Sequence, residues 1–566
     1  MASIEVQCRY PTFERYMRKV LYFMVSVWSS ALWAQAPFTS GYFNYHLTDR
    51  YEIQSGKLTT DFFTGIKPYR RDAVGKFAEE IEPLSTQDRF NKNYLLTDHY
   101  LFASAPLNVK RELRKLYRAD NALFLVKEDR FKAILNPVIG FSGAQVSDDS
   151  LAIYRNSRGV ELRGNIGNKV GFYSYALENQ VRFPSFLNDK YDANGSVTGA
   201  TLAKQFKGNA RDFFNVAGHI TFSPIEEITV QFGHDKNFIG NGYRSLILSS
   251  DATPHTFLKL NTKVWKFNYM NLYSIHTDSR GFQGNTPTAR KYAALHHLSL
   301  NVAKNLTLGV WENVVFDRQD STVTDRYEID YMNPLIFYRA VEHGLNSSDN
   351  VLLGMDWKWN FKKRFSFYGQ FVLDEFIKDE FFKATSSWVN KWGYQAGLKY
   401  INALGVNNLD AQLEVNQVRP YVYSHYSASQ NWIHYNQALA HPLGANFRES
   451  IAIIRYQPSN RWWVDARYSF STQGIDSSKT TTNYGGDITR GNRNITNRDQ
   501  VTMFQGVKNT IAALSVDVHY MIWHNLFLDA GVFIRNQNNA LMTTSLQTTL
   551  FRLGMRLNLT PIDYRQ

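Results

Sequence analysis

Aromatic and polar side chains are concentrated between Arg419 and Asn446. Flat aromatic rings offer a stacking surface to the C–H faces of a sugar, and their hydroxyl and N–H groups remain available for hydrogen bonds. The segment therefore predicts a polysaccharide-binding site at an outer surface. The alternative is a loop packed on itself, or a belt of rings at a membrane interface. The candidate residues are Tyr421, Tyr423, His425, Tyr426, Trp432, His434 and Tyr435.

A second polar segment runs from Gly233 to Ala252 and carries Asp235 and Arg244, which could bind hydroxyl or acidic groups of a glycan. Its Gly240-Asn241-Gly242 is a tight turn rather than a phosphate-binding loop, because no Lys-Ser/Thr pair follows it. The alternative interpretation is a loop that folds into a barrel and narrows its pore.

Enzymatic chemistry is not predicted. Asn333-Pro334 could begin a helical turn that brings Arg339, Glu342 and His343 together, but neither a nucleophile nor a metal-ligand spacing accompanies them. No G-x-S-x-G or H-E-x-x-H pattern occurs in the sequence. The spacing of the histidines between residues 419 and 446 matches no established metal motif. We expect no catalytic residue, no metal and no cofactor.

Long strands must position these segments. Between Ala513 and Asn536, apolar and polar residues alternate in two runs that are separated at His524-Asn525, which predicts a hairpin of long strands. In a transmembrane barrel, lipid covers the apolar face of such strands and the polar face lines the lumen. The same unit recurs along the chain. It predicts an all-β, antiparallel transmembrane barrel of about eighteen strands, since roughly seventeen can be counted and an even number is expected.

The last predicted strand, Leu550 to Leu559, carries two arginines on one face and only apolar side chains on the other. Arginine is costly against lipid and stable in a wet lumen, where carboxylates on other inward faces can pair with it. The charged residues expected to face the lumen are Asp356, Glu414, Asp465, Arg467, Asp517, Arg552 and Arg556.

Connection lengths alternate between short and long, as is typical of outer-membrane barrels with periplasmic turns and longer external loops. Short breaks are expected near residues 167, 223, 304, 362, 458 and 524. Long polar connections are expected at 182–211, 234–261, 277–291, 318–350, 377–391, 418–447 and 472–512.

The N-terminal part differs from the barrel. Arg18-Lys19, the apolar run Val20–Leu32 and the Ala34-Gln35-Ala36 site predict a secretory signal peptide, with Met17 as the expected start. Residues 1–36 are thus an over-extended start plus leader. Residues 37–120 are expected to form a small helical cap or plug at the periplasmic end, from helical spacing at Asp72–Ile81 and Val109–Tyr117. Residues 121–566 are then the barrel.

Composition agrees with an exported barrel. Aromatic residues make up 15% of the chain, as expected for aromatic belts at two membrane interfaces, and mean hydropathy is −0.37. The formal charge of +13 predicts an anionic partner such as acidic glycan or lipopolysaccharide phosphate, while no basic helix or finger predicts nucleic-acid binding. The single cysteine, Cys8, lies in the expected leader, so the mature chain should hold no disulfide.

Several short motifs resemble the Wzi capsule-assembly family of outer-membrane barrels. They are Ile66-Lys67-Pro68-Tyr69, Asp235 with Gly240-Asn241-Gly242 and Ser245-Leu246, Asn333-Pro334 with Arg339 and Glu342, and His441-Pro442-Leu443-Gly444. The resemblance implies a barrel of about eighteen strands, an N-terminal helical bundle and a non-enzymatic role in retaining surface polysaccharide. Two alternatives remain: a scaffold for gliding-motility or secretion machinery, with adhesin partners, and a channel for solutes or oligosaccharides.

Overall fold

The computed structural model describes most of the chain from residue 42 onward. The described residues are 42–99, 101, 119, 121–147, 149–167, 169–280, 288–318, 326–334, 338, 341, 345, 347–375, 379–380, 386–477, 481–493, 495, 498–541 and 545–561. The predicted leader and the segment Val109–Tyr117 lie outside this part, as do Arg339, Glu342 and His343.

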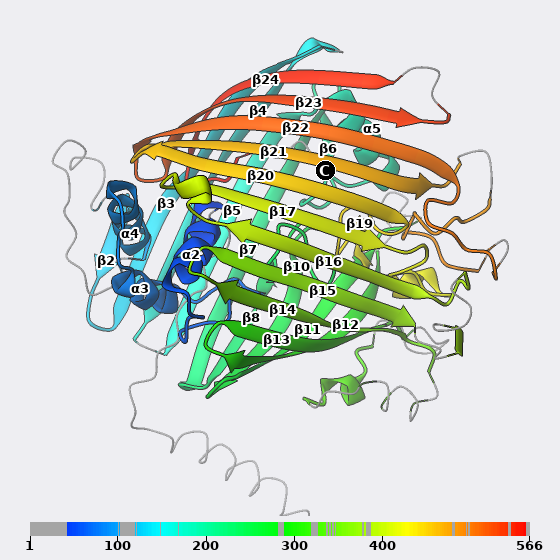
Figure 1. Ribbon diagram of the computed structural model, residues 1–566, viewed down its shortest axis with the longest axis horizontal. Helices are drawn as coiled ribbons and strands as arrows, with labels where there is room; N and C mark the ends of the chain where they lie inside the picture. The colour runs from blue at the N-terminus through cyan, green and yellow to red at the C-terminus, as the bar shows by residue number, and fades with distance from the viewer. Residues whose placement is uncertain are drawn as a thin grey trace, which may run out of the picture.

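Eighteen antiparallel strands form a closed barrel (Figure 1), which confirms the predicted fold class and strand number. The wall closes where the last strand pairs with the first, with Leu557 opposite Ile139. In chain order the strands are β3 (Phe131–Val146), β4 (Asp149–Ile166), β5 (Val170–Arg182), β7 (Ala210–Ile225), β8 (Ile228–Asp235), β10 (His255–Val264), β11 (Phe267–Asp278), β12 (Ala289–Ala303), β13 (Leu306–Phe316), β14 (Asn350–Phe361), β15 (Phe365–Glu375), β16 (Lys391–Tyr400), β17 (Leu409–Val418), β20 (Phe447–Ser459), β21 (Trp462–Ile475), β22 (Val507–Trp523), β23 (Leu526–Asn539) and β24 (Leu546–Leu557).

Short elements supplement the wall. β2 (Phe124–Lys127) pairs with β3, and β6 (Lys204–Phe206) pairs with β7. Two small ribbons are separate from the wall: β1 (Ile66–Lys67) with β9 (Phe238–Ile239), and β18 (Ile433–His434) with β19 (Gln437–Ala438). The described helices are α2 (Tyr42–Ser55), α3 (Arg71–Glu80), α4 (Thr86–Asp98) and α5 (Ser185–Asn194), with 3-10 turns at Ile329–Met332, Ala403–Gly405 and Ala428–Gln430. No described helix is both long enough and apolar enough to cross a membrane.

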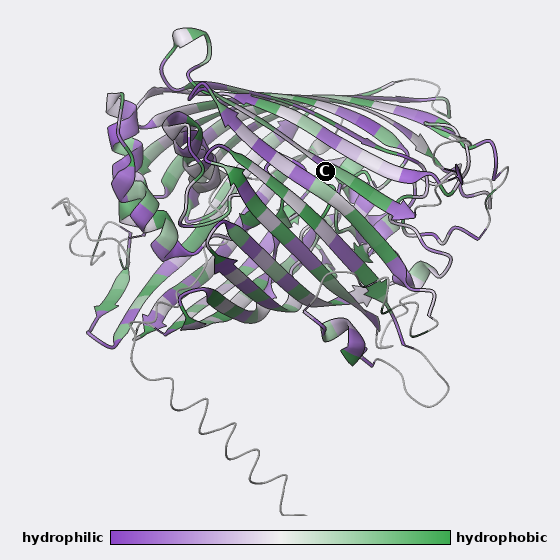
Figure 2. Ribbon diagram, turned by 60° about the horizontal axis from the view of Figure 1, so that its bottom comes forward, coloured by the Kyte–Doolittle hydropathy of each residue, from purple (hydrophilic) through white to green (hydrophobic). Residues whose placement is uncertain are grey.

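Hydrophobic and hydrophilic residues alternate along the strands of the wall (Figure 2), and burial follows the same alternation. On β24, Leu553 is 70% exposed on the outer face, whereas Arg552 is 6% exposed on the inner face. An outer surface covered by apolar side chains is stable only when a bilayer solvates it. The barrel therefore crosses a membrane.

Two sets of connections lie at opposite ends of the barrel. In Figure 1 the helices α2, α3 and α4 lie near the left end, with the hairpin turns, and the longer loops extend from the right end. The predicted cap is thus present, and α3 matches the expected helix at Asp72–Ile81 to within one residue.

Three predicted strand ends are displaced. Ser223-Pro224 is not a turn: both residues belong to β7, where the register shifts between Phe222 and Ile225, and the turn is Glu226-Glu227. Proline is compatible with this position because, in a bulge near a strand end, the backbone N–H that proline lacks would not form a hydrogen bond to the neighbouring strand. Similarly, the loop predicted at 234–261 ends at β10, and the loop predicted at 472–512 spans only the residues between β21 and β22.

Candidate functional site

Most of the aromatic side chains between Arg419 and Asn446 lie inside the barrel. Trp432 is 1% exposed, and its indole N–H donates to the Ile247 carbonyl at 2.9 Å. Tyr423 is also buried, and its hydroxyl donates to the Leu246 carbonyl at 2.8 Å. The rings therefore connect loop 419–446 to loop 236–254 in the interior of the barrel, whereas the alternative drawn from the sequence is a loop packed on itself.

The remaining candidates in this loop share that environment to different degrees. Tyr421 is buried, with its hydroxyl donating to the Asn483 carbonyl at 2.8 Å. His434 is buried, accepts a hydrogen bond from the Thr277 N–H and contacts the Pro254 carbonyl through its other ring nitrogen. Burial lowers the pKa of His434 to about 3, so the ring is neutral at physiological pH. His425 and Tyr435 are half-buried.

Tyr426 differs, because its side chain is 57% exposed. The guanidinium of the exposed Arg493 lies 4.1 Å from the centre of its ring, and the Arg493 Nε–H donates to the Tyr426 carbonyl. A second pair of this kind joins the half-buried Trp388 to the exposed Arg498, at 5.3 Å. Sequence patterns did not identify Trp388, Arg493 or Arg498, because these pairs join three loops that are far apart in the chain.

Asp235 and Arg244, the candidates from the second segment, are both buried and engaged. Asp235 Oδ2 lies 3.0 Å from His219 Nδ1. The Arg244 guanidinium forms an ion pair with Glu449 at 3.3 Å, and its backbone N–H donates to Glu414 at 3.0 Å. These contacts place loop 236–254 inside the barrel, which corresponds to the interpretation of a loop that narrows the lumen.

The N-terminal segment enters the same interior from the opposite end. β1 pairs with β9, and the Gly240 N–H donates to the Gly65 carbonyl at 2.7 Å. Gly240 adopts φ = 143°, and a side chain there would collide with Gln370. Two of the motifs behind the family resemblance, at residues 66–69 and 240–242, therefore meet inside the barrel.

Helix α2 is fixed to the wall by buried ion pairs. Asp49 pairs with Lys358 at 2.6 Å and with Lys399. Lys358 also pairs with Glu52, and Arg50 pairs with Asp410. Helix α2 therefore contacts β14, β16 and β17, and it shares the interior of the described barrel with the two inward loops.

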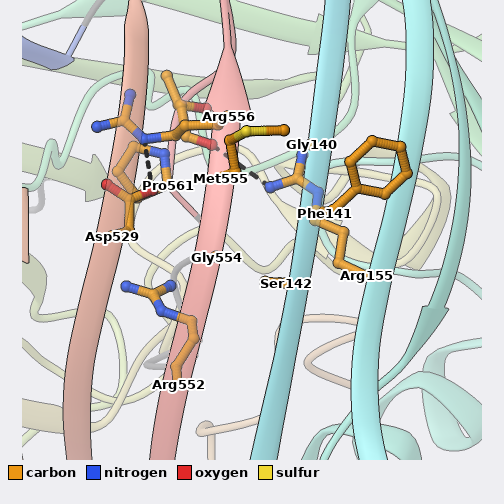
Figure 3. A pocket seen from close by; sticks show the side chains of 11 residues that line it. Gly140, Phe141, Ser142, Arg155, Asp529, Arg552, Gly554, Met555, Arg556 and Pro561 are labelled. Atoms are coloured by element: carbon orange, nitrogen blue, oxygen red, sulfur yellow. Dashed lines mark hydrogen bonds and ion pairs between the residues drawn. The ribbon is translucent and has the colours of Figure 1, made fainter. Parts of the chain in front are cut away.

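All seven residues expected to line the lumen point inward and have partners. Asp517 pairs with Arg552 at 2.5 Å, and Arg556 Nε donates to Asp529 at 2.8 Å. Figure 3 shows Arg155, Arg552 and Arg556 beside Asp529 around a cavity of about 20 Å³, which has room for one water molecule. Asp356 pairs with His297, Glu414 accepts from Tyr368, Asp465 lies beside Arg455 and His519, and Arg467 donates to Tyr243.

Histidine rings gather near Trp432 without forming a metal site. The rings of His255, His276 and His434 have centroids 5.0 to 6.3 Å apart. Both ring nitrogens of His434 already bond to backbone groups. Within the described residues, no three His, Cys, Asp or Glu side chains are arranged to hold a metal ion.

The chain is similar to one protein family and to solved outer-membrane barrels. The family model "Capsule assembly protein Wzi" matches residues 220–550. The structure of Wzi from Escherichia coli, described as a carbohydrate-binding β-barrel involved in group 1 capsule assembly, covers 94% of this chain and 100% of its own, with a TM-score of 0.56 and 11% identity. OprD from Pseudomonas aeruginosa covers 75% of this chain and 94% of its own, with a TM-score of 0.41 and 11% identity. A search of curated proteins found no match.

Proposed function

Because the chain belongs to the Wzi capsule-assembly family of outer-membrane proteins, we propose that it retains surface polysaccharide by binding it with the loops at the outer end of the barrel. The short hairpin turns then face the periplasm and the long loops face outward. The main support is the exposed Tyr426–Arg493 pair, which presents a flat ring and a cation side by side on the outer loops.

The buried aromatic residues have a different role in this proposal. Trp432 and Tyr423 hold the carbonyls of loop 236–254, so they set the shape of the outer surface without touching the glycan. The glycan contacts the exposed rings and guanidinium groups, where an aromatic face packs against a sugar and arginine bonds to carboxylate or hydroxyl oxygens. We infer that this role needs no catalysis, metal or cofactor.

Retention of capsular polysaccharide on cells tests the proposal. Tyr426→Ala combined with Arg493→Gln should reduce retention several-fold while the thermal unfolding midpoint stays unchanged, because neither side chain is part of the interior. Trp265→Ala is the matched control, since Trp265 is a similarly exposed ring on a turn at the opposite end. Unchanged retention in the double variant, or an equal loss in the control, would contradict the assignment to these loops.

A further inference from the structure

Exposed cations gather on one sector of the periplasmic rim. Lys304 is in the β12–β13 turn, and Lys362, Lys363 and Arg364 form the whole β14–β15 turn. Lys57 follows α2 and completes this group, which we call the cationic arc. All five side chains are exposed, and none forms an ion pair with a described carboxylate.

Backbone contacts hold the arc together. The Leu58 N–H donates to the Lys304 carbonyl at 2.7 Å, and the Asn305 side chain donates to the Asn360 carbonyl at 2.7 Å. Gly56 adopts φ = 72°, and a Cβ there would lie 2.8 Å from Lys363 Cγ. Three segments that are distant in sequence thus bring like charges together, which is unfavourable unless an anion is present.

Two lysines of the β14–β15 turn adopt a left-handed backbone conformation. Lys362 and Lys363 have φ values of 52° and 53°, the left-handed conformation of a tight hairpin that favours Asn-Gly. Each such residue costs free energy relative to glycine, and such strain is common at binding sites. Two other turns at this end are acidic: the β7–β8 turn is Glu226-Glu227, and the turn before β3 carries Glu128 and Asp129 beside Arg130.

Aromatic side chains lie on the outer face of the wall directly above this turn. Trp359 is 44% exposed, and its ring is 4.7 Å from that of Phe361, which stacks on Phe365 at 5.3 Å. Rings of this kind mark the level of the membrane interface. At about 3.3 Å per residue, Lys362 lies within roughly 10 Å of Trp359 along the strand, at the depth of lipid head groups.

We propose that the cationic arc binds an anionic phospholipid of the inner leaflet of the outer membrane. The head-group phosphate lies among Lys304, Lys362 and Lys363, and the acyl chains lie against the aromatic rings above them. Lys57 connects this lipid to the N-terminal helices. The lipid site is at the opposite end from the proposed glycan surface and does not depend on it.

Native mass spectrometry of the detergent-solubilised barrel tests this proposal with dioleoyl phosphatidylglycerol and dioleoyl phosphatidylcholine as probes. Each cation near an anionic head group contributes about fivefold in affinity. The wild type should bind phosphatidylglycerol at least tenfold more tightly than phosphatidylcholine. Lys362→Gln/Lys363→Gln/Arg364→Gln should abolish that preference, while Lys127→Gln/Arg130→Gln, exposed cations of the β2–β3 hairpin, should retain it.

The controls separate the possible sources of the anion. Heat-dependent gel mobility verifies that each variant is a folded barrel. Equal binding of the two lipids by the wild type, or an intact preference in the triple variant, would overturn the proposal. It would also be overturned if soluble glycerol phosphate or alginate displaced phosphatidylglycerol at equal charge concentration, since the arc would then recognise a free phosphate or a periplasmic polymer.

Discussion

Replacing Lys358 by Met should release helix α2 from the barrel wall. Lys358 is 1% exposed, and its ammonium group contacts Asp49, Glu52 and the Thr64 hydroxyl. Met fills a similar volume but leaves the carboxylates of Asp49 and Glu52 without the cation they share, and Lys399 still pairs with Asp49. Breaking a buried ion pair from one side costs about 3–5 kcal/mol. This lost free energy weakens the docking of helix α2 onto the wall and leaves the pairing of the strands unchanged.

Hydrogen–deuterium exchange measures this effect directly. A loss of 3 kcal/mol increases the population of the undocked helix by about a hundredfold, so the amides of Tyr42–Ser55 should exchange about a hundred times faster. The amides of β14 should exchange at the wild-type rate. Lys304→Met is the matched control, because Lys304 is exposed and makes no described ion pair. Unchanged exchange in α2, or equal acceleration in the strands, would refute the reasoning.

The same contact predicts how docking depends on pH. Burial opposes ionisation of Asp49, but Lys358 and Lys399 outweigh it and hold the pKa of Asp49 below its usual range. A carboxylate whose pKa is lowered on folding contributes stability above its unfolded value and loses it as the pH falls toward the folded value. Helix α2 should therefore stay docked at pH 5 and exchange faster only below about pH 4.

Three further predictions follow from the interior and the outer face. The wild-type barrel should give no steady conductance in planar bilayers, since α2 and the two inward loops occupy the lumen; large, stable channels would favour the transport alternative. Between pH 7.5 and pH 5 the wild type should lose about 2 kcal/mol of stability at the outer loops, because His434 binds a proton in the unfolded chain but stays neutral when it is buried. His434→Gln should reduce this loss, as measured by thermal unfolding. Leu553→Arg should reduce folding into vesicles by about 2–4 kcal/mol, whereas Leu541→Arg, in the loop after β23, should not.

The barrel could be predicted from sequence because its physical cause is local. Each strand must present alternate residues to lipid and to the lumen, so a period of two is visible in stretches such as Leu550–Leu559. The errors arose where that rule is interrupted. Ser223-Pro224 resembles a turn, yet the Ser223 hydroxyl lies 3.3 Å from that of Thr229 across the hairpin, and a bulge accommodates the proline. The sequence pattern predicts a loop over residues 255–261, but these residues belong to β10, which pairs with both β8 and β11.

The location of the loops could not be predicted in the same way. Aromatic and polar residues of the same types suit either a glycan surface or a packed interior, because both need rings with hydrogen-bonding groups. What decides between them is contact with distant residues: Trp432 reaches Ile247, Arg244 reaches Glu449, and Thr64 reaches Asn241. None of these pairs is visible in a single sequence. Two short motifs of the family resemblance, at residues 66–69 and 240–242, meet inside the barrel next to the Thr64–Asn241 contact, so they contribute to how the barrel is filled.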